Sequence, residues 1–434
     1  MRPAPMRILL VSFFFPPHNQ IGAVRNSKFA KYLTRAGHEV RVLCAQDAPV
    51  PKTLALEIDA ARVTYSRWYN VNRLPELLLG GRQKVAAQGY RRPGWKGRLL
   101  GRLGQFYAAC TNIPDGLVGW YWPARRAGDA LLREWRPDVI VATTPVTGLL
   151  VGSALAARHG VPWVADMRDL WTDNPVQVSR SALREWLEKR LEQRTLGSAR
   201  GFVAIAQSSA EVLARRYGKP VTTILNGFDS EDLERLGPIE PAPGLPLRLA
   251  FTGMVYPEHQ RLDLLFAALR EFSPAELRID FYGRNLFPIQ NLIAEYRVPE
   301  LVRVHPPVSY DDSLRLQRAA DALLFFTWAD SSQHGIMSGK IYEYLAARRP
   351  LLLIGPEVDD VTRMVGARAA GSLHPTSAAI AARLREWLVL KRSGQPLPPT
   401  PASACAGIDR QSQAQQLAEF LQRCLSIAPA PPRQ

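Results

Sequence analysis

The sequence is poor in cysteine and histidine and has no long apolar run. Its 434 residues include seven histidines and four cysteines, Cys44, Cys110, Cys405 and Cys424. The cysteines form no Cys-x-x-Cys pair, which argues against a zinc site or a disulfide framework and indicates a reducing compartment. A membrane-spanning helix needs about 18 consecutive apolar residues, and no such run occurs.

The common metal-binding and phosphate-binding motifs are also missing. No Asp-x-Asp pair occurs, so no metal is expected, and arginine, lysine or a helix N-terminus would have to neutralise the charge of a phosphate leaving group. A P-loop is excluded because only three residues separate Gly335 from Gly339 and Ile341 follows Lys340. Gly-x-Gly-x-x-Gly is absent as well.

The chain is long and basic. Its length predicts two domains of about 200 residues, and its 47% apolar content is typical of a globular protein. The formal charge is +16, and residues 62–136 hold fourteen Lys or Arg against four acids. We expect a basic insert at about 66–117 that faces an anionic membrane surface, although a solvated basic face is the simpler alternative. No nucleic-acid-binding fold is recognisable, so nucleic acid is not an expected partner.

Apolar runs alternate with helical spacing along the chain, which predicts two α/β domains with parallel sheets. The expected strands are 8–13, 40–44, 61–65, 138–142, 163–165, 202–205, 221–225, 248–252, 277–282, 302–304, 322–326 and 351–354. Residues 1–15 imitate a signal peptide, but Pro16 and Pro17 follow in place of a cleavage site, so we expect a first strand and a cytoplasmic protein. Five prolines and glycines within 238–246 indicate a linker.

Residues 335–345 combine small residues with the start of a helical pattern. A helix beginning near Ser338 would offer free N–H groups to a phosphate, with Lys340 adding charge and Glu343 accepting hydrogen bonds from sugar hydroxyls. The alternative is an ordinary packed helix N-terminus with a solvated lysine.

A second polar cluster follows the strand 163–165. Asp166, Arg168 and Asp169 could orient an acceptor hydroxyl, stabilise positive charge at a sugar carbon, or bind a pyrophosphate. Alternatively, Arg168 pairs with both carboxylates only to fix the loop. The loop after the first strand should border the same site, because ligands bind at the carboxyl ends of parallel strands. Its candidates are Pro17, His18, Gly22 and Arg25, although His18 is equally compatible with a structural role.

Taken together, these motifs resemble glycosyltransferase family 4, whose members have the GT-B fold. The resemblance covers nearly the whole chain and rests on order and spacing. Its marks are Phe15-Pro16-Pro17 with Gly22 and Arg25, Gly37-His38-Glu39-Val40, Ile224-Leu225-Asn226-Gly227-Phe228-Asp229, Phe251-Thr252-Gly253, and Gly339-Lys340-Ile341-Tyr342-Glu343-Tyr344-Leu345.

The resemblance implies two Rossmann-like domains whose parallel sheets face each other across a cleft, and a C-terminal helix that crosses back. We expect an acceptor domain at 1–236, a donor domain at 247–395 and the returning helix at 408–427. It also implies a retaining transferase with an internal-return mechanism. The donor would be a nucleotide sugar, here expected to carry UDP, and the acceptor a carbohydrate or a polyprenyl-linked glycan on the inner membrane face.

The resemblance further implies the donor-site residues. Glu343 matches the glutamate that holds the ribose, and the expected set is Gly253, Arg261, Gly335, Ile336, Met337, Ser338, Gly339, Lys340 and Glu343. Two positions depart from the family, since Gly335 stands where a second glutamate is frequent and Met254 where an arginine is frequent. Two alternatives remain open: a non-hydrolysing UDP-sugar 2-epimerase, which shares the fold, and a catalytically silent nucleotide-sugar-binding module, which is compatible with the missing second glutamate.

Overall fold

The computed structural model describes residues 4–48, 50–78, 95–173, 182–284, 286–328, 338–356 and 359–427. The chain divides into two compact units. The first comprises residues 1–205, 209–224 and 414–434, and the second comprises 206–208 and 225–413.

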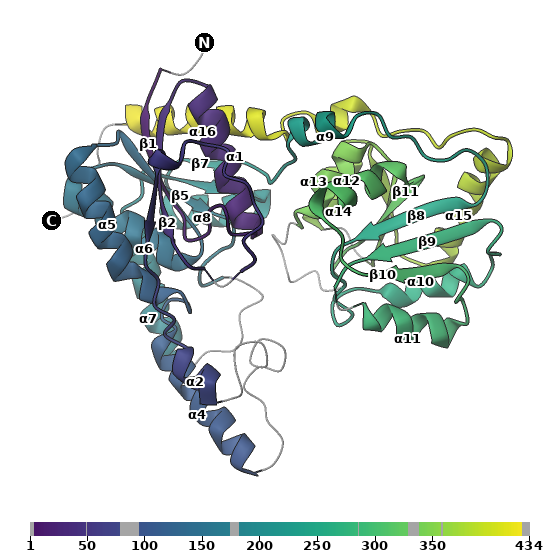
Figure 1. Ribbon diagram of the computed structural model, residues 1–434, viewed down its shortest axis with the longest axis horizontal. Coiled ribbons are helices and arrows are strands. Elements are labelled where there is room, and N and C mark those ends of the chain that lie inside the picture. The colour runs from purple at the N-terminus through teal and green to yellow at the C-terminus, as the bar shows by residue number, and fades with distance from the viewer. Residues whose placement is uncertain are drawn as a thin grey trace. The chain divides into compact units, whose positions relative to one another are not determined.

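The described residues of the first unit form a seven-stranded parallel sheet with the order β3-β2-β1-β4-β5-β6-β7 (Figure 1). Its strands are β1 (Arg7–Val11), β2 (Glu39–Ala45), β3 (Val63–Ser66), β4 (Val139–Thr143), β5 (Trp163–Met167), β6 (Gly201–Ala204) and β7 (Val221–Thr223). Its helices are α1 (Ile21–Arg35), α2 (Arg73–Leu78), α4 (Trp95–Thr111), α5 (Tyr121–Glu134), α6 (Val146–His159), α7 (Ala182–Leu196), α8 (Gln207–Tyr217) and most of α16 (Arg410–Ser426).

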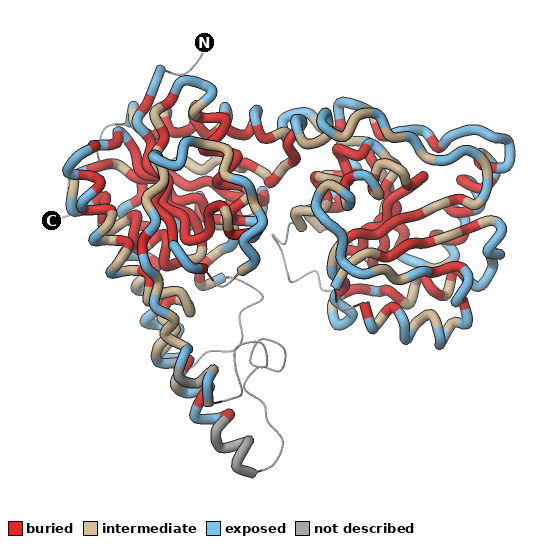
Figure 2. Tube along the Cα trace, viewed as in Figure 1, coloured by how far each residue is buried: buried red, intermediate tan, exposed pale blue. Residues whose placement is uncertain are grey.

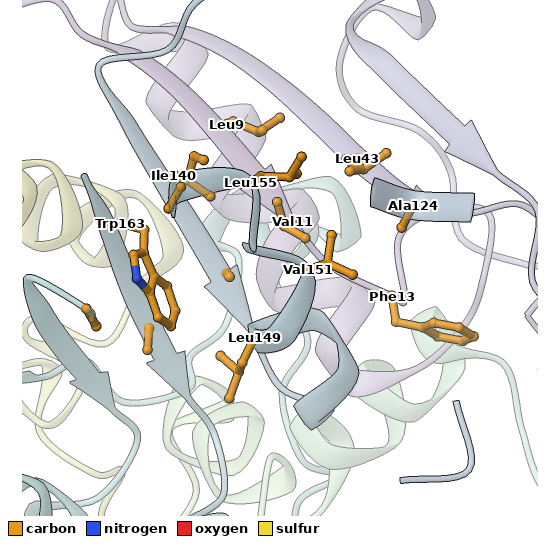
Figure 3. Packing of buried hydrophobic residues seen from close by; sticks show 14 of the residues in the cluster. Leu9, Val11, Phe13, Leu43, Ala124, Ile140, Leu149, Val151, Leu155 and Trp163 are labelled. Carbon is orange, nitrogen blue, oxygen red and sulfur yellow. The ribbon is translucent and has the colours of Figure 1, made fainter. Parts of the chain in front are cut away.

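One face of this sheet packs against α5 and α6. Figure 3 shows the apolar side chains of β1 and β4 meeting Leu149 and Leu155 of α6. The approach of α6 to the sheet is close, because a Cβ built at Gly152 would lie 2.3 Å from the Cβ of Ala142. Any side chain larger than that of glycine at position 152 would therefore prevent this close contact between α6 and β4.

The opposite face is covered by α1 and by the C-terminal helix α16. Leu417 and Leu421 of α16 belong to the same buried cluster as Leu10 of β1 and Phe29 of α1. The prediction that the C-terminal helix returns to the first domain is therefore confirmed.

The described residues of the second unit form a six-stranded parallel sheet with the order β10-β9-β8-β11-β12-β13. Its strands are β8 (Leu247–Thr252), β9 (Leu277–Tyr282), β10 (Val302–His305), β11 (Ala322–Phe326), β12 (Leu351–Ile354) and β13 (Gly371–His374). Its helices are α9 (Ser230–Leu236), α10 (Leu262–Leu269), α11 (Phe287–Tyr296), α12 (Tyr310–Ala319), α13 (Lys340–Ala347), α14 (Asp360–Ala367) and α15 (Ser377–Arg392).

The predicted α/β class with two parallel sheets is confirmed, and Figure 2 shows the strands of both sheets as the buried core. In each sheet the strand order reverses at one place, between β1 and β4 in the first and between β8 and β11 in the second. Ligands of open α/β sheets bind beyond the carboxyl ends of the strands at such a reversal. The two reversals therefore define where a site should lie in each unit.

Candidate active site

An ion pair between Arg25 of α1 and Asp166 of β5 lies at the carboxyl edge of the first sheet. Arg25 donates from Nη2 to Asp166 Oδ1 at 3.0 Å and from Nε to Oδ2 at 3.2 Å, and both side chains are almost wholly buried. Arg25 Nη2 also donates to the carbonyl of Ile224 at 2.9 Å, and Thr143 Oγ1 donates to Asp166 Oδ2 at 3.2 Å. The pair thus ties α1, β4, β5 and the end of β7 together, inside the fold.

Arg168 does not pair with both Asp166 and Asp169, because Asp166 accepts its hydrogen bonds from Arg25. Its guanidinium lies against the first turn of α1, where a Cβ built at Gly22 would be 2.0 Å from Nη1. Among the described residues, Arg168 Nε and Nη1 have no hydrogen-bond partner, and Nη2 lies 3.9 Å from Asp169 Oδ2. Burial lowers the pKa of Arg168, which the nearby carboxylates raise only in part. A buried guanidinium with unused N–H groups is suited to an anion.

Asp169 is the exposed acid of this segment, with 59% of its side chain accessible. The nearby Trp171 is buried in the apolar core of the first unit. The two acids of this segment therefore differ: Asp166 is buried, whereas Asp169 is exposed and can reach a ligand.

His18 and Pro17 form hydrogen bonds that stabilise the loop after β1. His18 is fully buried, and its Nε2 accepts a hydrogen bond from the backbone N–H of Ala48 at 3.2 Å. Burial lowers its pKa, with the charge of Lys52 acting in the same direction, so the imidazole is neutral. The carbonyl of Pro17 accepts from the N–H of Leu54 at 3.1 Å. These contacts stabilise the loop and indicate a structural role for both residues.

In the second unit, Lys340 begins α13 and reaches across to the end of β8. Its Nζ donates to the carbonyl of Met254 at 3.3 Å and lies 4.1 Å from the ring centre of Phe251. A Cβ at Gly253 would be 3.0 Å from this nitrogen, and the φ of Gly253 is +126°, a conformation that glycine alone adopts readily. Burial lowers the pKa of Lys340 to about 8, although Glu343 partly opposes the shift.

Glu343 lies one turn further along α13. Its Oε2 accepts a hydrogen bond from Gln317 Nε2 at 3.3 Å, and the same amide donates to Thr252 Oγ1 at 3.0 Å. Burial raises the pKa of Glu343, while Gln317, Arg410 and Lys340 counteract the shift. A carboxylate and an ammonium group therefore lie one turn apart near the strand-order reversal of the second sheet.

The remaining predicted donor residues fall in different places. Arg261 Nη2 donates to Asp263 Oδ2 at 2.7 Å, and its Nε donates to Oδ1 at 2.9 Å, in an exposed pair at the start of α10. Ser338 and Gly339 precede α13, and Gly339 is its N-cap with no side-chain hydrogen bond. Gly335, Ile336 and Met337 lie outside the described residues.

Sequence patterns alone missed the surroundings of Glu343. Gln317 is fully buried on α12, and the charge of Arg410 acts on the Glu343 carboxylate. Burial raises the pKa of Tyr310, and Glu343 raises it further. No local signal marks these residues, because they approach Glu343 only through the packing of α12 and the start of α16.

Two features are absent from the described part of the chain. In that part of the chain, no group of three or more His, Cys, Asp or Glu side chains is placed to hold a metal ion. None of the described helices is long and apolar enough to cross a membrane.

Part of the sequence matches a known protein family. Residues 23–232 match the sequence profile described as Glycosyltransferase Family 4. No curated protein matches the sequence significantly.

Solved structures match over almost the whole chain. Sucrose-phosphate synthase from Thermosynechococcus elongatus has 15% identity and a TM-score of 0.61, with 96% of this chain and 98% of that chain covered. HepE from Anabaena, solved with UDP and glucose, has 16% identity and a TM-score of 0.56, with 96% and 99% covered. A glycosyltransferase from Rickettsia africae has 12% identity and a TM-score of 0.60, with 98% and 100% covered.

At these identities the structural matches establish the fold, and the sequence profile supplies the family. Residues 23–232 belong to glycosyltransferase family 4, a retaining family of nucleotide-sugar glycosyltransferases, and the solved structures show that the chain has the GT-B fold of that family.

Proposed function

We propose that the protein transfers a sugar from a UDP-sugar to a carbohydrate or lipid-linked carbohydrate acceptor. The observation that carries the donor assignment is the placement of Lys340 Nζ, 3.3 Å from the carbonyl of Met254 at the end of β8, with Glu343 one turn along the same helix. The ammonium group would contact the diphosphate, and the carboxylate would accept hydrogen bonds from the ribose hydroxyls. The UDP bound to HepE, a protein of the same fold, supports the choice of base.

The lysine has a definite task in the reaction. The bond between the sugar C1 and the UDP oxygen breaks, a bond from C1 to the acceptor oxygen forms, and the acceptor proton passes to the leaving phosphate. Negative charge grows on the diphosphate during this step, and Lys340 at the N-terminus of α13 would stabilise it. In a retaining family, attack on the face that the leaving group vacates is consistent with an internal-return mechanism.

The acceptor would bind at the carboxyl edge of the first sheet. Asp169 is exposed there and is the proposed partner of the acceptor hydroxyl or of positive charge at C1. The guanidinium of Arg168, two of whose N–H groups are buried without a partner among the described residues, would turn toward a phosphate of the acceptor, which favours a pyrophosphate-linked glycan. Asp166 would act as a positioning residue through Arg25 rather than touch substrate.

The direct test is an incubation of the protein with labelled UDP-glucose, UDP-galactose and UDP-N-acetylglucosamine, with and without a bacterial lipid extract. Transfer of label to an organic-soluble product that requires the extract supports the proposal. Conversion of the sugar nucleotide to its 2-epimer would identify an epimerase instead. If no label moves and UDP still binds, the protein is a nucleotide-sugar-binding module and the proposal fails.

A further inference from the structure

Among the side chains of helix α4 that the structure describes, large apolar ones are exposed and small ones are buried. Leu103 and Phe106 are 56% and 70% exposed, whereas Gly101, Gly104 and Ala108 are buried. The three small residues recur at i, i+3 and i+7 and therefore share one face of the helix. A helix that only covers its own domain places its large apolar residues on the buried face. The described side chains of α4, from residue 101 onward, show the reverse arrangement.

The position of α4 leaves its exposed apolar side chains available to a partner. Figure 1 shows α4 extending away from the sheet of the first unit, and Tyr107 Oη donates to the carbonyl of Val71 at 2.9 Å, which fixes the helix to the chain before α2. Leu77 of α2 is also 66% exposed. Large apolar residues gathered on one projecting segment indicate an interaction surface rather than scattered surface residues.

The charge of α4 restricts the partner. The helix sequence contains Lys96, Arg98 and Arg102 and no acidic residue, and Arg102 is exposed. A second copy of this chain would bring the same cationic helix and a formal charge of +16, so two copies would repel each other across this face. A nucleic acid has phosphates but no apolar phase for Leu103 and Phe106. A bilayer with anionic lipids offers both.

We propose that the α4 face, defined as Arg102, Leu103 and Phe106, docks on the surface of a bilayer that contains anionic lipids. The helix would lie in the interfacial plane, with Leu103 and Phe106 at the boundary of head groups and acyl chains and Arg102 among the lipid phosphates. This surface would hold the first unit beside a lipid-linked substrate, but the docking does not depend on which sugar is transferred.

The test measures how the full chain partitions onto vesicles of phosphatidylcholine with and without phosphatidylglycerol, at low and high salt, by flotation. The variants are Phe106→Ser, Leu103→Ser and Arg102→Gln. The matched controls are Phe287→Ser, which removes a phenylalanine that is 68% exposed on α11 of the second unit, and Arg303→Gln, which removes an exposed arginine of β10. Circular dichroism melts confirm that each variant folds.

We expect salt-sensitive binding that requires phosphatidylglycerol. Phe106→Ser and Leu103→Ser should each weaken partitioning about tenfold, and Arg102→Gln about fivefold, while both controls bind like wild type. Wild type that does not float, or floats equally with neutral vesicles, would overturn the proposal. Equal losses in Phe287→Ser and Phe106→Ser would overturn it too, as would a wild-type dimer that Phe106→Ser dissociates.

Discussion

Arg25 and Asp166 are 141 residues apart in the sequence and form a buried two-point ion pair, with Nη2 3.0 Å from Oδ1 and Nε 3.2 Å from Oδ2. The contact joins the helix after β1 to the end of β5, on either side of the strand-order reversal in the first sheet. The pair therefore sets the geometry of the sheet edge that carries the buried Arg168 and the exposed Asp169.

Replacing Asp166 by Asn should destabilise the protein. The change leaves the guanidinium of Arg25 buried opposite a neutral amide, which costs about 3 kcal/mol of unfolding free energy. Urea denaturation measures this loss. Asp169→Asn is the control, because an exposed carboxylate contributes within about 0.5 kcal/mol. Equal midpoints for the two variants would show that the pair does not hold the loop edge together.

Asp169→Asn should lower turnover and leave donor affinity unchanged. Its carboxylate is proposed to act at the reacting centre, and loss of such a group typically costs about a hundredfold or more in rate. Steady-state kinetics with a labelled UDP-sugar separates kcat from the donor KM. Asp47→Asn, at a side chain that is 70% exposed in the same unit, serves as the control. Normal turnover in Asp169→Asn would show that Asp169 is a solvated residue of the loop with no role at the reacting centre.

Gly22→Ala should disturb acceptor binding through Arg168. The new Cβ would lie 2.0 Å from Nη1, so the guanidinium must move away from the first turn of α1. We expect a KM for the acceptor raised about tenfold, since one charge-assisted hydrogen bond is lost, with UDP affinity unchanged.

The control for this change is Gly366→Ala on α14, because a Cβ built there meets nothing within 4 Å. If Gly22→Ala raises the donor KM and the acceptor KM equally, the effect is one of general misfolding rather than of Arg168.

UDP binding should weaken as the pH rises through 8. Burial lowers the pKa of Lys340 to about 8, so the free protein carries a neutral amine above that pH and the charged ammonium below it. If the diphosphate needs the ammonium form, affinity should fall by up to about tenfold per pH unit above this pKa. Calorimetric titrations from about pH 7 to about pH 9 test this. Lys340→Ala, which has no such group, should show a flat profile, and a flat wild-type profile would contradict the role.

Much of the fold follows from local patterns. Buried parallel strands are short apolar runs, so β4, β11 and β12 were visible as such, and the alternation with helices implied crossover connections. The structure also contains elements that the patterns did not reveal. Strand β13 (Gly371–His374) contains one large apolar residue, and α9 (Ser230–Leu236) is too polar to show helical spacing. The only local mark of α9 is its N-cap Asp229, whose side chain accepts a hydrogen bond from the N–H of Glu231.

The sites were harder to predict, because their geometry depends on contacts that are distant in sequence. The motif containing Glu343 was recognisable, whereas its hydrogen bond from Gln317 depends on how α12 packs. The pairing of Arg25 with Asp166 was likewise invisible, and the nearer Arg168 was the obvious candidate. In α4 the sequence showed the positive charge but not the helix, since three glycines obscure its spacing. The basic residues between 82 and 92 lie outside the described residues.

The central claim is that the second unit binds a nucleoside diphosphate through Lys340 and Glu343. Calorimetry should compare UDP and uridine on wild type, Lys340→Ala and Glu343→Gln, with melting curves to confirm folding. Glu343→Gln should weaken both ligands, because both carry the ribose. Lys340→Ala should weaken UDP by about 2 kcal/mol, roughly thirtyfold, and leave uridine unchanged, because only UDP carries the diphosphate. Equal losses of UDP and uridine in Lys340→Ala would contradict the account.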